Sequence, residues 1–159
     1  MQNVSLTDAE IASRTDNEEI HGKHMVFSVC GVNYAIEIEY VTEIIGIQPI
    51  TPVPNLPSYV KGIANVRGTI VPVVDMRAKF GLERVPYDER TCIILACKDD
   101  INIGLIVDSV EDVIQLSQED ILPPPRGNAD GRNKYLKAIG KCGDHVEQIL
   151  DISKIIDAN

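Results

Sequence analysis

The sequence has no tryptophan, few aromatic residues and a deficit of positive charge. Aromatic side chains make up 4% of the 159 residues, and 15 lysines and arginines stand against 24 aspartates and glutamates, a formal net charge of −9. An acidic surface repels a phosphate backbone, and scarce aromatic side chains leave few platforms on which bases could stack. The composition therefore argues against a protein that binds nucleic acid.

Long hydrophobic runs are also missing. The longest, such as residues 92–97, span about six residues, whereas a membrane-spanning helix needs roughly twenty. The N-terminus has neither a basic start nor an apolar stretch, so it does not resemble a secretory signal. We therefore expect a cytoplasmic protein without a membrane-inserted segment.

Cysteine and histidine are too scattered to predict a metal site. In a cytoplasmic protein we expect reduced and mostly buried thiols, and the four cysteines are Cys30, Cys92, Cys97 and Cys142. None of them forms the C-x-x-C spacing that is typical of zinc sites. His21 and His24 have a helical i, i+3 spacing, but two ligands next to an acidic tail make a weak candidate. We expect no metal and no cofactor.

Catalytic motifs are absent. The sequence has no G-x-G-x-x-G, no P-loop and no G-x-S-x-G pattern. The segment 62–69 superficially suggests a phosphate loop, yet it lacks the lysine and no long helix follows it. These absences predict a protein that is not an enzyme. The alternative from a different class is a small ligand-binding β-barrel protein.

The sequence does contain a series of short β-type runs. Tyr34, Ile36, Ile38 and Tyr40 alternate with other residues, which is the period of a half-buried strand. Similar runs bounded by turn signals predict strands near 25–30, 34–40, 43–47, 59–66, 69–74, 91–97, 101–108, 110–116, 135–141 and 145–152. A helical turn is expected at 75–80, closed by Gly81. The pattern predicts an all-β fold, built as a sandwich or as small barrels.

Two segments differ from these runs. Residues 1–23 are acidic and poor in apolar side chains, so we expect a flexible tail, in which Thr7 and Glu10 match a capping box that favours a short, frayed helix. Four prolines between residues 49 and 57 exclude a helix or a central strand there. Such a stiff loop suits a recognition surface, although a plain connector explains it equally well.

The two halves of the chain resemble each other. Residues 34–45 align with 103–114, residues 59–63 with 135–139, and residues 70–75 with 146–151. The same order of strand, acidic bend, proline-rich loop and two further strands thus occurs twice. A duplication of this kind predicts two small barrels of about five strands each around a shared core.

One position differs informatively between the copies. The acidic Glu43 aligns with Asp112, whereas the basic Arg67 falls opposite Gly143. A requirement of the fold should act on both copies, so Glu43 and Arg67 are candidates for function. The alternative is an ordinary surface ion pair, worth about 0–1 kcal/mol.

A longer string carries a specific resemblance. The pattern N-x-R-G-x-x-x-P-V-x-D-x-R runs from Asn65 to Arg77. Together with the segments 34–38, 41–44, 53–57, 104–110 and 121–125, it resembles the CheW-type chemotaxis adaptor family over about residues 24–156. The resemblance implies two five-stranded SH3-like β-barrels related by an approximate dyad. The first would comprise about residues 24–66 plus 143–152, and the second about residues 67–142.

The same resemblance implies a function. Members of this family are non-enzymatic scaffolds that couple transmembrane chemoreceptors to the CheA histidine kinase in membrane-associated arrays. The cytoplasmic tip of a methyl-accepting receptor would lie in an apolar groove between the barrels, lined by Ile38, Val41, Gly62, Val107 and Val110. The small Gly62 would let a receptor helix approach the barrel backbone. Glu43 and Arg67 match a basic–acidic pair that looks important for signalling in the family.

The resemblance also implies kinase contacts. The regulatory domain of the kinase would dock through the proline-rich loop, at Pro49, Pro52, Pro54 and Leu56. A second contact would involve the second barrel near Pro124 and Arg126. A related pathway that controls pili or gliding could use the same adaptor, and the sequence does not distinguish the two.

Overall fold

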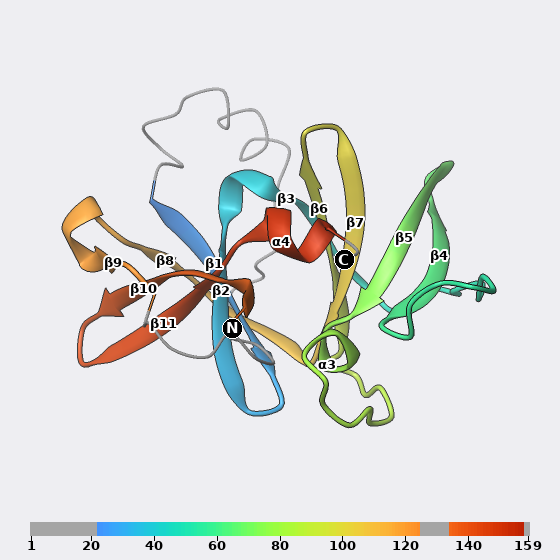
Figure 1. The fold of residues 1–159 in the computed structure, drawn as a ribbon, viewed down its shortest axis with the longest axis horizontal. Helices are drawn as coiled ribbons and strands as arrows, with labels where there is room; N and C mark the ends of the chain where they lie inside the picture. The colour runs from blue at the N-terminus through green and yellow to red at the C-terminus, as the bar shows by residue number, and fades with distance from the viewer. Residues whose placement is uncertain (1–21, 125–133, 158–159) are drawn as a thin grey trace.

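Two sheets lie side by side along the long axis of this computed structural model, which describes residues 22–124 and 134–157 (Figure 1). In spatial order, the first sheet contains β8 (Ser109–Gln115), β1 (Lys23–Val29), β2 (Val32–Glu37), β11 (His145–Leu150), β10 (Leu136–Cys142) and β9 (Ile121–Leu122). The second contains β3 (Val41–Gly46), β6 (Cys92–Lys98), β7 (Ile101–Val107), β5 (Thr69–Asp75) and β4 (Val60–Val66). The short helices are η1 (Ile38–Tyr40), α3 (Met76–Lys79), η2 (Gln118–Asp120) and α4 (Ile152–Ile156). The expected all-β class with short helical turns is confirmed.

The internal repeat is visible in the strand registers. Glu43 on β3 pairs with Leu95 across a bulge at residue 42, and Asp112 on β8 pairs with Val26 across a bulge at residue 111. The bulge between Val60 and Gly62 on β4 likewise recurs between residues 136 and 138 on β10. The parallel pair β5–β7 corresponds to the parallel pair β11–β2. Strands β1–β5 therefore repeat as β6, β7, β8, β10 and β11.

Each sheet combines strands from both copies. The first sheet takes β1 and β2 from the first copy and β8, β10 and β11 from the second, and the second sheet takes the complementary set. The last strand was expected to return to the first strands of the chain, and β11 does pair with β2. The expected barrel boundaries are wrong, because β3 and β4 lie in the second sheet rather than beside β1 and β2. The sheet that a strand joins depends on pairing between segments that are far apart in the sequence. Local sequence patterns do not show such pairing.

The largest core cluster is shared by both sheets. It contains Phe27 and Ile36 from the first sheet, Ile94 and Leu105 from the second, and Ile155 from α4. Figure 1 shows α4 over the junction of the two sheets, where its buried Ile152 and Ile155 reach this cluster. Two smaller clusters fill the individual sheets, one around Ile93 and Val73 and one around Val26 and Ile149. The shared core ties the barrels into one unit.

Several local expectations need correction. The strand expected at 34–40 ends at Glu37, and η1 follows because the chain must cross from the first sheet to the second before β3. The run expected at 145–152 ends at Leu150, after which Asp151 caps α4 by accepting a hydrogen bond from the Ser153 N–H. The α3 turn agrees with its prediction.

Residues 22 and 23, which were expected to belong to the tail, are tied to the first sheet. The carbonyl oxygen of Gly22 accepts a hydrogen bond from the Leu116 N–H at 2.9 Å, and β1 begins at Lys23. His24 is 3% exposed, and its Nδ1 lies 2.8 Å from the same carbonyl, so it has a structural role. Thr7, Glu10 and His21, which the sequence analysis singled out, lie outside the described residues.

The thiols are less buried than expected. Cys30 is exposed, and the other three cysteines are partly buried. Cys30 lies in the two-residue turn between β1 and β2 with a φ of 53°, where the tight hairpin leaves no room to fold the side chain into the core. The prediction of buried thiols is therefore wrong for Cys30.

Candidate functional site

Arg67 occupies a conformation that arginine rarely adopts. Val66 pairs with Thr69, so Arg67 and Gly68 form a two-residue turn between β4 and β5, with φ angles of 51° and 88°. Two positive φ angles define a type I′ turn, which favours Asn, Asp or Gly at both central positions. The Asn65 Oδ1 accepts a hydrogen bond from the Gly68 N–H at 2.9 Å and fixes the turn. Unusual backbone at a non-glycine residue points to a function of the side chain.

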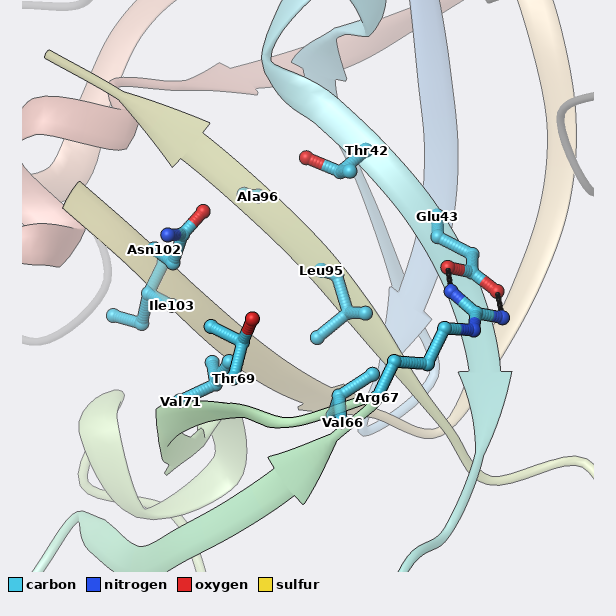
Figure 2. Close-up of a pocket in the computed structure, with 10 residues that line it drawn as sticks. All are labelled: Thr42, Glu43, Val66, Arg67, Thr69, Val71, Leu95, Ala96, Asn102 and Ile103. Atoms are coloured by element: carbon cyan, nitrogen blue, oxygen red, sulfur yellow. Dashed lines mark hydrogen bonds and ion pairs between the residues drawn. The ribbon is translucent and has the colours of Figure 1, made fainter. Parts of the chain in front are cut away.

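The Arg67 side chain reaches across the second sheet to Glu43. Both terminal nitrogens of its guanidinium donate hydrogen bonds to the two carboxylate oxygens (Figure 2). Since β3 and β4 are opposite edges of this sheet, the pair closes the barrel. Hydrogen bonding from Arg67 lowers the pKa of Glu43, and the carboxylate raises the pKa of Arg67. The Arg67 side chain is 71% exposed, so solvent screens the pair and its contribution to stability is small.

An apolar cavity of about 250 Å³ opens beside this pair. Val71, Leu95 and Ile103 supply apolar wall, and Thr42 and Asn102 add polar atoms (Figure 2). Glu43 and Arg67 are the titratable residues in its lining. The volume lies below the roughly 300–1,000 Å³ of typical small-molecule sites. The cavity suits one apolar side chain of a protein partner better than a metabolite.

The five residues predicted to line a receptor groove are mostly inside the protein. Ile38, Val41 and Val107 are at most 6% exposed and belong to the shared core. Gly62 is buried as well, and Val110 alone of the five is half-buried. In this conformation the side chains of Ile38, Val41 and Val107 cannot act as surface anchors, because the two sheets pack over them.

Gly62 has a role within the chain. Thr51 and Ile63 exchange backbone hydrogen bonds of 2.8 and 2.9 Å, and a Cβ atom on Gly62 would overlap the Thr51 carbonyl oxygen. The expected close approach is real, but the approaching backbone is the chain's own proline-rich loop. A partner helix has no access at this point.

The predicted kinase loop is on the surface. Pro49, Pro52, Pro54 and Leu56 are all exposed, and Leu56 retains 45% of its accessible surface. Pro124 is exposed as well, and Arg126 lies outside the described residues. The loop and the Glu43–Arg67 pair thus present accessible side chains on the second sheet. Most of the predicted groove residues do not.

The comparisons with known proteins identify the family. The model of the CheW-like domain matches residues 23–159. The chain belongs to the CheW-like family. It is 34% identical over 146 residues to the chemotaxis protein CheW of Klebsiella aerogenes, with 92% of this chain and 88% of that protein covered. The CheW of Bacillus subtilis is 33% identical over 135 residues, covering 85% of this chain and 86% of that protein.

A solved CheW structure has the same fold. The scaffolding protein TtCheW from Thermoanaerobacter tengcongensis superposes with a TM-score of 0.75 at 32% identity, covering 82% of this chain and 88% of that one. No helix in the two described ranges is long and apolar enough to cross a bilayer. Within the same ranges, no group of three or more metal-binding side chains comes together.

The motif of this CheW-like chain divides into structural and exposed parts. Asp75 accepts hydrogen bonds from two N–H groups of α3 and from the Tyr87 hydroxyl at 3.0 Å. Arg77 donates to both oxygens of Asp108, at 3.0 and 2.6 Å, where the chain passes from β7 to β8. Burial raises the pKa of Asp108, but the hydrogen bonds from Arg77 and from the Cys30 N–H lower it by more. Arg67 is the motif residue whose charged group remains largely exposed.

The sequence did not reveal the cavity. Its walls come from β3, β4, the β4–β5 turn, β5, β6 and β7, and several of these segments are far apart in the chain. One local signal was available, because Thr69 and Val71 follow Arg67 at alternating positions of one strand and so share a face. The residues contributed by β6 and β7 had no such signal.

Proposed function

We propose that this chain is a non-enzymatic adaptor that couples chemoreceptors to a CheA-type histidine kinase at membrane-associated arrays. Its family membership supports this role, and the solved relative is described as a scaffolding protein. The observation that carries the proposal is the exposed Glu43–Arg67 pair beside an apolar cavity. The pair holds the strained turn residue Arg67 in place, and it exists in one copy of the repeat. Together with the cavity beside it, the pair offers a partner both a charged and an apolar contact.

The kinase contact is assigned to the proline-rich loop. Val53 and Leu56 are 37% and 45% exposed, and a loop rich in proline loses little conformational entropy when it binds. Burying one leucine side chain contributes about 1.5–3 kcal/mol. A second contact is assigned to the region of Pro124, which is exposed at the end of the described range.

The receptor contact is assigned to the surface at the junction of the sheets. Of the groove residues, Val110 has an accessible side chain, while Ile38, Val41 and Val107 lie beneath it in the shared core. A receptor helix would be recognised through apolar side chains at i, i+3, i+4 and i+7. Individually weak contacts suffice in an array, because multivalent assembly raises the effective concentration.

A direct titration tests the proposal. The purified chain should bind the regulatory domain of the kinase and the cytoplasmic tip of the receptor encoded by its own genome. Leu56→Ser should weaken kinase binding by roughly 10-fold or more, whereas Ile101→Ser, at a similarly exposed apolar residue in the β6–β7 hairpin, should leave it unchanged. A chain that binds neither partner would refute the adaptor role.

A further inference from the structure

Another cavity, of about 200 Å³, lies beside the proline-rich loop. It opens between the start of β4 and the segment that joins α3 to β6. Arg84 ties it to the loop, because the Arg84 guanidinium donates a hydrogen bond to the carbonyl oxygen of Ser58, two residues after Leu56. We call its six lining residues the cationic cavity, and they are Lys61, Asp75, Arg84, Val85, Pro86 and Tyr87.

Two positive side chains of this cavity have no carboxylate partner. In the part of the chain that the structure describes, no carboxylate oxygen lies within 4.0 Å of the Lys61 ammonium or the Arg84 guanidinium. The Lys61 Nζ instead lies 5.5 Å from the centroid of the Tyr87 ring. The carboxylate of Asp75 is already occupied, since it accepts hydrogen bonds from two N–H groups of α3 and from the Tyr87 hydroxyl. On a chain with a net charge of −9, both cations thus remain available to an acidic group from outside.

Apolar side chains accompany the two charges. Val85 is 42% exposed, and Pro86 disfavours a helical backbone at Val85, which limits the conformational freedom that binding would remove. The adjoining proline-rich loop adds Val53 and Leu56, which are 37% and 45% exposed. A free anion would use the charges alone and leave these apolar side chains in water. The combination therefore suits a protein surface on which a carboxylate stands next to apolar residues.

We propose that the cationic cavity receives an acidic side chain of the kinase regulatory domain, and that Arg84 thereby helps to select this partner. The choice of partner rests on the proposed adaptor function, because the cavity continues the proline-rich loop that is assigned to the kinase. An arginine can donate two parallel hydrogen bonds to a carboxylate. The bond to Ser58 uses one terminal nitrogen of Arg84, and the guanidinium has further N–H donors for a partner.

A titration of the kinase regulatory domain at two salt concentrations tests the charge contact. At about 0.05 M salt, Arg84→Glu should weaken binding by about tenfold or more, because it places a like charge against the acidic group. Arg90→Glu changes the net charge equally, at an exposed arginine of the same segment that does not line the cavity, and should stay within about twofold of the wild type. At about 0.5 M salt the difference between the wild type and Arg84→Glu should shrink, since salt screens the contact.

Lys61→Gln separates a charge contact from an effect on the loop. It removes one cation of the cavity and leaves the bond from Arg84 to Ser58 in place. Binding should weaken in the same direction as for Arg84→Glu, and its dependence on salt should become flatter. If Arg84→Glu lowers affinity equally at both salt concentrations while Lys61→Gln binds as the wild type does, Arg84 only orders the loop and the inference is overturned.

The remaining outcomes are also decisive. Wild-type affinity of both Arg84→Glu and Lys61→Gln for the kinase domain would overturn the inference and leave the adaptor role standing. An effect of Arg84→Glu on binding of the receptor tip, or of a second copy of this chain, in place of the kinase domain would overturn the partner assigned to the cavity. A wild-type chain that binds neither kinase nor receptor would instead refute the adaptor role itself.

Discussion

Arg67 has a side chain that its local backbone conformation disfavours. Its φ of 51° belongs to a region that bulky L-residues avoid, and its ion pair is too exposed to contribute much stability. Asparagine suits the same backbone and lacks the charge. Substitution of Arg67 can therefore test a signalling role separately from folding.

We expect Arg67→Asn to leave the fold intact and to abolish kinase activation. The free energy of unfolding should change by less than about 1 kcal/mol, because a weak pair is lost while the turn is relieved. Urea titration and a reconstituted receptor array measure the two quantities. The charge swap of Arg67→Glu with Glu43→Arg should restore activation if the residues act through each other. Additive effects within about 0.3–0.5 kcal/mol in a double-mutant cycle would contradict their coupling.

Glu147 gives a prediction with a defined pH direction. Because burial raises its pKa above the usual value of 4.5, the folded state holds the proton more tightly than the unfolded state. Stability contributed by this group is present at low pH and is lost as pH rises through that window. Glu147→Gln removes the ionisation, so the variant should gain stability relative to the wild type as the pH rises from 4 to 7. Urea titrations at pH 4 and pH 7 check this, and a stability difference independent of pH would contradict it.

At the scale of elements, both copies cap the short helix after their last strand with an aspartate, but the two aspartates differ in burial and in hydrogen bonding. Asp75 and Asp151 cap α3 and α4, and each donates its own N–H to a tyrosine carbonyl, from Tyr59 and Tyr135 respectively. Asp75 is 3% exposed and also accepts from the Tyr87 hydroxyl, which ties the loop after α3 to the sheet. Asp151 is half-buried, and its side chain caps α4 by accepting a hydrogen bond from the Ser153 N–H.

We expect Asp75→Ala to destabilise the protein more than Asp151→Ala. Loss of a cap costs about 1 kcal/mol, and leaving the Tyr87 hydroxyl unpaired adds roughly 1–3 kcal/mol at Asp75 alone. Urea unfolding of both variants measures the difference. Tyr87→Phe in the Asp75→Ala background should recover part of the loss. Equal losses for the two aspartates would show that the Tyr87 contact contributes nothing.

At the scale of the whole molecule, the interleaved sheets make each copy dependent on the other. The strands of residues 23–75 are divided between both sheets, as are those of residues 92–150. Neither half can complete a barrel, since β1 needs β8 and β2 needs β11 from the other half. The shared core contains residues of both.

A chain divided in the exposed loop before β6 should show this dependence. Fragments 1–88 and 89–159 should each lack a cooperative unfolding transition, because each would expose half of the shared core to water. An equimolar mixture should regain the β-type circular dichroism and a cooperative transition. Cooperative unfolding of either fragment alone would show that one copy is an independent unit.

Much of the local structure could be predicted from the sequence. Period-two patterns located most of the strands, the repeat aligned Arg67 with Gly143 at equivalent turn positions, and the predicted partnership of Arg67 with Glu43 is present. These features depend on neighbouring residues or on a comparison of the two halves, and both kinds of information are written along the chain. Helix α4 was not predicted. It begins at Ile152, within the run 145–152 that was expected to be a strand, because β11 ends at Leu150.

The sequence by itself determined the all-β class, the duplication, the motif and its charged pair. The tertiary structure alone decided which strands share a sheet, and therefore that Val41 and Val107 are core residues, that Thr51 fills the space beside Gly62, and that Glu147 is buried. Apolar residues of a groove and of a core look the same in a sequence, because both alternate along a strand. Their exposure depends on what packs over them, and that is set by pairing between distant strands.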